Sequence, residues 1–192
     1  MTEYEKHIKS LGFPENGDPY WYLKNFEAFR KATEERDKCV AKYSWAILTE
    51  ETISRLEKYQ PFLEIGAGTG YWAYEFRKKG IQIIATEPIL SQKWTEIEIL
   101  TGQCALDKYD DGKHTLLVCW PTYADDWAFK ALKEFKGDTV VYVGEGNEGC
   151  TADEQFHALL EKDWNIIEEI DIPQWPGLHD LIMIYYRKNK VC

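Results

Sequence analysis

The chain has 192 residues, of which 44% are hydrophobic and 15% aromatic, and this composition is typical of a folded globular protein. Its 33 acidic and 23 basic side chains give a formal charge of −10, and residues 61–192 carry −9 of it, with 22 acidic against 13 basic side chains. Because a surface that binds phosphate backbones needs clustered lysine and arginine, this balance disfavours nucleic acids and anionic membranes as partners.

The five cysteines are scattered along the chain, without a C-x-x-C pair or a tight cluster with histidine. This spacing predicts reduced thiols and neither a disulfide framework nor a zinc module. His7, His114 and His157 have no neighbours at metal-ligand spacing, so we predict no metal site. No apolar stretch approaches the ~20 residues that span a bilayer, and the first residues lack the apolar core of a signal peptide. We therefore expect a cytoplasmic protein, with a nuclear one as the alternative.

Residues 1–60 are expected to form a helical N-terminal cap, which either packs on the rest of the chain or covers a ligand as a lid. Thr49 precedes acidic residues and an apolar face, as at a capped helix start. An earlier helical face is predicted from residues at helical spacing, namely Tyr22, Phe26, Phe29 and Thr33.

Residues 61–192 alternate short apolar runs with amphipathic segments, a pattern that predicts parallel strands and crossover helices. The last predicted strands are separated by only 173–179, too short for a crossover helix, so they should pair antiparallel. We predict a Rossmann-like α/β fold with helices on both faces of a seven-stranded, mostly parallel sheet closed by an antiparallel C-terminal hairpin. The strands are expected near 62–65, 81–85, 97–100, 115–119, 139–143, 164–172 and 180–187.

A glycine-rich turn follows the first predicted strand and precedes a predicted helix. It reads Gly66-Ala67-Gly68-Thr69-Gly70, and glycines at such a turn let the backbone bend sharply and approach a ligand. The spacing is G-x-G-x-G, whereas a dinucleotide fingerprint would require glycine at the position of Tyr71. Glu64 lies within the preceding strand, and Glu87 ends the next strand, 21 residues after Gly66.

This pattern resembles motif I of the class I S-adenosylmethionine-dependent methyltransferases. The stretches 142–145 and 175–180 are similar to a group of small methyltransferase-like proteins within that superfamily. The resemblance implies S-adenosylmethionine as cofactor, with the glycine loop, from Gly66 through Ala67, Gly68 and Thr69 to Gly70, packed on its methionine part. It also implies that Glu64 orients the cofactor's amino group and that Glu87 accepts the ribose hydroxyls. Gln103, in the turn 101–104, would contact the adenine edge, although an exposed glutamine is an equal alternative.

The acceptor side is implied by Trp120-Pro121-Thr122-Tyr123, which departs from the D/N-P-P-Y/F signature of amino-group methyltransferases. Pro121 and Tyr123 match it, while Trp120 replaces the polar residue. The predicted catalytic residues are Tyr123, Trp120 and His179, with Trp120 also touching the cofactor. For Trp120 a core-filling role stays open, and for His179 that of a solvated loop histidine. Glu145, at the end of another predicted strand, is a further polar candidate.

The predicted function is methyl transfer from S-adenosylmethionine to a small molecule or a protein side chain, with residues 61–192 as the cofactor-binding domain. Two alternatives remain open. One is a protein that binds S-adenosylmethionine or S-adenosylhomocysteine without turnover, because the acceptor motif is altered. The other is an NAD-dependent oxidoreductase, which Tyr71 and the predicted hairpin disfavour.

Overall fold

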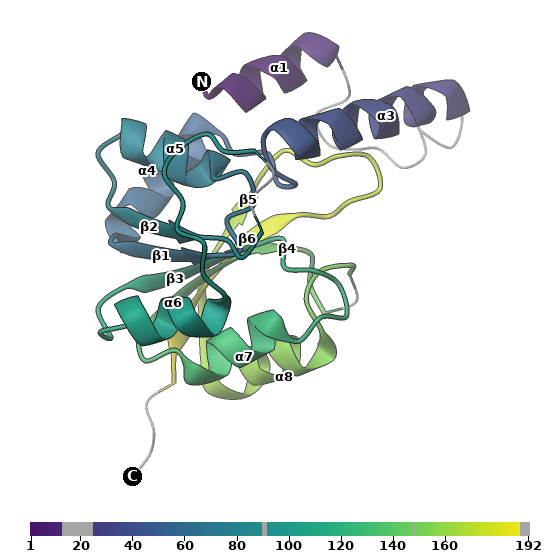
Figure 1. Cartoon of the computed structure of the whole chain (residues 1–192). Coiled ribbons are helices and arrows are strands. Elements are labelled where there is room, and N and C mark those ends of the chain that lie inside the picture. Colours follow the sequence, from purple (N-terminus) through teal and green to yellow (C-terminus); the bar gives the residue numbers. More distant parts are fainter. Residues whose placement is uncertain (13–24, 90–91, 148, 189–192) are drawn as a thin grey trace.

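The computed structural model describes residues 1–12, 25–89, 92–147 and 149–188, and its centre is one mixed sheet of six strands in the order β2-β1-β3-β4-β6-β5 (Figure 1). The first four strands in the chain pair in parallel, and β6 is antiparallel to both of its neighbours. Their bounds are β1 Phe62–Ile65, β2 Ile83–Thr86, β3 Thr115–Cys119, β4 Thr139–Gly144, β5 Trp164–Asp171 and β6 Leu181–Arg187.

The prediction of seven strands was wrong for the described chain, because residues 97–100 form no strand. Only Glu98 joins the sheet, through an isolated parallel bridge to Thr86. Its backbone N–H donates to Ala85 at 3.0 Å, and its carbonyl accepts from Glu87 at 3.0 Å. Ile97 is buried, whereas Ile99 is 68% exposed, so too few apolar side chains alternate here to hold a strand against β2.

Side chains alternate along the strands and separate two hydrophobic cores, one on each face of the sheet. Phe62 and Leu117 point to the face covered by α4 (Glu50–Leu56) and α5 (Tyr71–Lys78). Leu63 and Leu116 point to the face covered by α6 (Gly102–Tyr109), α7 (Trp127–Glu134) and α8 (Glu154–Asp163). The helices therefore lie on both sides of the strands, as Figure 1 shows.

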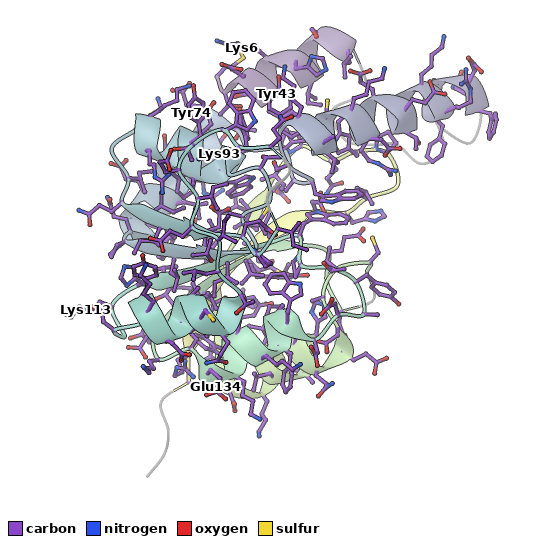
Figure 2. All side chains as sticks on the ribbon, in the orientation of Figure 1. Lys6, Tyr43, Tyr74, Lys93, Lys113 and Glu134 are labelled. Carbon is purple, nitrogen blue, oxygen red and sulfur yellow. The ribbon has the colours of Figure 1, made fainter. Side chains whose placement is uncertain are left out.

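The first helix, α1 (Glu3–Leu11), is anchored by a fully buried tyrosine. The Tyr4 ring stacks on Tyr43 with centroids 4.7 Å apart, and Figure 2 shows Tyr43 where the C-terminal end of α3 (Phe26–Lys42) approaches α1. The Tyr4 backbone N–H donates to the Tyr71 hydroxyl at 3.0 Å, and its own hydroxyl accepts from Trp175 Nε1 at 2.9 Å. These contacts tie α1 to α5 and to the segment between β5 and β6.

The aromatic face expected on α3 is not its buried face. Phe26 is 75% exposed and Phe29 is 36% exposed, whereas Ala32 and Cys39 are buried. The N-terminal end of α3 extends past the sheet in Figure 1, and Phe26 is the first residue of the helix. Tyr22, expected on the same face, lies outside the described residues. None of the described helices is both long enough and apolar enough to cross a membrane.

Candidate functional site

A cavity of about 590 Å³ lies at the carboxyl ends of the parallel strands. This volume is in the range of small-molecule sites, and the carboxyl ends of parallel strands are where open α/β sheets bind ligands. Its walls come from segments far apart in the sequence. They include Tyr43, Ser44 and Trp45 after α3, Glu64 on β1, residues 66–69, residues 87–89 after β2, Thr101, Gly102, Trp120 and Trp127.

The three glycines of the loop after β1 have different structural roles, although all have positive φ angles. A Cβ on Gly68 (φ 54°) would meet nothing within 4 Å, so this glycine leaves open space beside the cavity. A Cβ on Gly66 would lie 2.8 Å from Trp127 Cη2, and one on Gly70 would lie 2.6 Å from Ile97 Cδ1. Gly70 does not line the cavity, so its packing against Ile97 explains its presence.

Glu64 is a buried carboxyl group in the cavity wall. It lies on β1, is 1% exposed, and its Oε2 has no hydrogen-bond partner within the described chain. Burial raises the pKa of Glu64 to about 8, with Arg77 opposing the shift and Glu87 adding to it. A buried acceptor without a partner is costly, so this oxygen is suited to a donor supplied by a ligand.

Glu87 lies directly after β2 and is fixed against the glycine loop. Its carboxylate accepts from the Gly68 backbone N–H at 2.9 Å and from the Ile89 backbone N–H at 3.3 Å. Glu87, Gly68 and Ile89 all line the cavity. The structure therefore brings together the loop and both acidic residues that the sequence analysis singled out.

Trp120 and Trp45 form an aromatic wall of the cavity. Their rings are stacked, with centroids 4.4 Å apart and planes 9° from parallel. Trp120 has a positive φ of 52°, and its Nε1 donates to Asp180 Oδ1 at 2.7 Å. Asp180 is 1% exposed, and burial raises its pKa to about 7. The wall thus joins the segment after α3, the end of β3 and the segment before β6.

Four predicted residues lie outside the cavity lining: Gly70, His179, Tyr123 and Gln103. Tyr123 is 64% exposed, and Thr122 lines the cavity in its place. Gln103 is exposed in the first turn of α6, where its Nε2 donates to Asp107 at 3.1 Å. Thr101 caps that helix by accepting from the Cys104 N–H, and it lines the cavity. The cap was a signal in the sequence that our assignment of 101–104 to a turn overlooked.

Glu145 joins the loop after β4 to the segment before β6 and does not line the cavity. Its Oε2 accepts from the Cys150 backbone N–H at 2.9 Å, and its Oε1 accepts from the His179 backbone N–H at 2.8 Å. Burial raises the pKa of Glu145, but a hydrogen bond from the Cys150 thiol together with these two backbone hydrogen bonds outweighs it and leaves the pKa below its ordinary value. The His179 side chain is 78% exposed, so the cluster closes two loops and does not extend the cavity.

Other residues of the cavity wall carried no motif. Trp45 and Tyr43 belong to the predicted cap, and Trp127 begins α7. Only the three-dimensional arrangement brings them to the glycine loop. The sequence analysis included Asp180 only as the last residue of the stretch 175–180, without a role of its own.

No protein-family model and no curated protein sequence matches this chain. Solved structures do match. The 1,6-didemethyltoxoflavin-N1-methyltransferase of Burkholderia thailandensis, with bound 1,6-didemethyltoxoflavin and S-adenosylhomocysteine, has a TM-score of 0.55 at 12% identity over 98% of this chain and 92% of that chain. A Streptococcus pneumoniae protein described as a candidate tRNA (m1A22) methyltransferase, in complex with S-adenosylmethionine, has a TM-score of 0.51 at 13% identity over 76% of each chain. The chain has the class I methyltransferase fold.

Proposed function

We propose that the protein is an S-adenosylmethionine-dependent methyltransferase that acts on a small molecule. The observation that carries the proposal is the pairing of two features in one cavity: the unpartnered Glu64 Oε2, and the open space that Gly68 leaves. A buried acceptor requires a donor, and a loop without a side chain lets a ligand approach its backbone. The likeness of fold to methyltransferases agrees with this assignment.

The cavity residues fit S-adenosylmethionine by the chemistry of their groups. The loop 66–69 would lie against the methionine part, Glu64 would accept from its amino group, and Glu87 would accept from the ribose hydroxyls. When bound, the cofactor supplies a methyl group on a positively charged sulfur. The protein's own contribution is to hold the acceptor in line with that methyl and to exclude water.

We propose that the acceptor meets the aromatic wall of Trp45 and Trp120. A planar or cationic small molecule can stack on such a wall. The charge of −10 also favours a cationic small molecule over nucleic acid. In this proposal residues 1–60 form a cap over the domain 61–192, because Tyr43, Ser44 and Trp45 close one side of the cavity.

A second candidate is a protein that binds the cofactor without turnover. The specific observation in its favour is the acceptor motif, where Trp120 stands at the polar position and the Tyr123 side chain is 64% exposed outside the cavity. The protein would then lack the polar side chain that orients the lone pair of an amine acceptor toward the methyl group.

Calorimetric titration with S-adenosylhomocysteine and, separately, with NADH tests the cofactor. We expect saturable binding of the first alone; binding of NADH alone would contradict the proposal. Transfer of labelled methyl from S-adenosylmethionine to a metabolite extract and to a protein extract then tests the enzyme. Label in the metabolite pool supports the proposed function, label confined to protein moves the acceptor to a protein side chain, and no label in either pool supports the non-catalytic binder.

A further inference from the structure

Three metal-ligating side chains meet between α1 and α3, and none of them lines the cavity described above. His7 lies on α1, and Glu35 and Cys39 lie one turn apart on α3. One ligand atom from each, a histidine nitrogen, a carboxylate oxygen and the cysteine sulfur, all lie within 4.8 Å of one another. His7 and Glu35 are 28 residues apart in the chain, so sequence spacing did not reveal the group.

We propose that His7, Glu35 and Cys39 form a binding site for a borderline-soft divalent metal ion such as Zn²⁺. Imidazole, carboxylate and thiolate are the ligand types that zinc takes in proteins. With three protein ligands, a tetrahedral ion keeps its fourth position for water. The site does not depend on the proposed methyl transfer.

The separation of the His7 and Glu35 ligand atoms suits coordination after small side-chain movements. His7 Nε2 and Glu35 Oε1 are 3.0 Å apart, and two ligand atoms on a tetrahedral zinc ion with bonds of about 2.0–2.1 Å are about 3.3 Å apart. The ion would therefore take the place of the direct contact between these two atoms. His7 and Glu35 keep side-chain exposures of 35% and 23%, which gives an ion a path from solvent.

The other contacts of the ligands leave room for a metal. Lys38 Nζ lies 3.1 Å from Glu35 Oε2. Lys38 contacts the oxygen that does not face His7, so it leaves Oε1 available. Cys39 is a free thiol that is 2% exposed. On binding, its proton passes to solvent and the sulfur lone pair forms the bond to the ion.

The Zn²⁺ titration uses the full chain, reduced and freed of metal by a chelator, with a chromophoric competitor. We expect one ion per chain and a rise in melting temperature on adding Zn²⁺, because an ion that binds only the folded state stabilises it. With Co²⁺ as the probe, the thiolate ligand should give an intense near-ultraviolet charge-transfer band. No saturable binding by the unmutated protein would overturn the proposal.

The variants Cys39→Ala and His7→Gln remove one ligand each, and Cys104→Ala removes an exposed thiol as the matched control. We expect either ligand variant to weaken Zn²⁺ binding by more than about tenfold. Cys39→Ala should also abolish the cobalt band, while Cys104→Ala should leave both unchanged. If Cys39→Ala does not fold, His7→Gln decides alone, because His7 is partly exposed on a helix surface. Unchanged binding in a folded ligand variant, or loss of the band in Cys104→Ala, would show that the site lies elsewhere.

Discussion

The Glu87 carboxylate accepts a hydrogen bond of 2.9 Å from the backbone N–H of Gly68, and this contact joins the end of β2 to the loop after β1. As a consequence, the Glu87 side chain and the open space at Gly68 border the same region of the cavity. A ligand bound there would meet both groups at once. Because the donor is the backbone N–H of Gly68, replacing Glu87 also removes a contact that holds the glycine loop.

Gly68→Val is expected to abolish binding of S-adenosylhomocysteine while the protein stays folded, because its side chain would fill the open space beside the cavity. Gly80→Val is the matched control, since Gly80 also has a positive φ, of 79°, and open space at its Cβ, but does not line the cavity. Both variants carry the backbone strain of roughly 1–2 kcal/mol for a left-handed residue. Calorimetry and thermal melting of the two proteins separate ligand exclusion from strain. Equal binding by both would contradict our assignment of the loop.

Glu87→Ala should weaken S-adenosylhomocysteine binding by ~1.5–3 kcal/mol, or about 10- to 150-fold, the scale of hydrogen bonds to a charged acceptor. An analogue that lacks both ribose hydroxyls should lose most of its sensitivity to the substitution. Glu96→Ala, which alters an exposed carboxylate outside the cavity, should leave both affinities unchanged. If parent compound and analogue weaken equally, Glu87 acts through the loop and does not bind the ribose.

Glu64→Gln should change how stability depends on pH. The pKa of about 8 for Glu64 in the folded chain lies above its ordinary value near 4.5, so the folded state holds this proton more tightly than the unfolded state. Its contribution to stability is full below about pH 4.5 and is lost as pH rises through about 8. Relative to the unmutated protein, Glu64→Gln should therefore gain free energy of unfolding between about pH 5 and pH 8.5. Urea unfolding across this range measures the difference, and parallel profiles would show that Glu64 is not protonated near neutral pH.

Trp120→Phe should lower the free energy of unfolding by about 1–3 kcal/mol, because it removes the donor to the buried Asp180 carboxyl group. Trp45→Phe is the matched control, since it shortens the other ring of the stack and leaves the Asp180 hydrogen bond intact. Urea unfolding at neutral pH compares the variants. A loss of equal size in both would assign the effect to the aromatic stack and not to the hydrogen bond.

Local patterns in the sequence predicted the elements that depend on neighbours along the chain. Alternating apolar runs predicted the strands of the sheet, and the spacing from Glu64 through Gly66, Gly68 and Gly70 to Glu87 predicted a ligand loop with acidic residues beside it. The structure places these acidic residues at one cavity because the carboxyl ends of neighbouring parallel strands lie along one edge. The prediction of a seventh strand at 97–100 was wrong, because strand formation there depends on packing against β2. A local sequence pattern carries no information about that packing.

By itself, the sequence determined which segments could form turns, helix caps or strands with alternating apolar side chains. These properties depend on a residue and its near neighbours. Only the tertiary structure decided which distant side chains meet. It stacked Trp45 on Trp120, hydrogen-bonded Trp120 to Asp180, brought His7 to Glu35 and Cys39, and left Tyr123 exposed outside the cavity. The physical reason is that burial and long-range contact depend on how helices and strands pack together, and the same local pattern is compatible with many such packings.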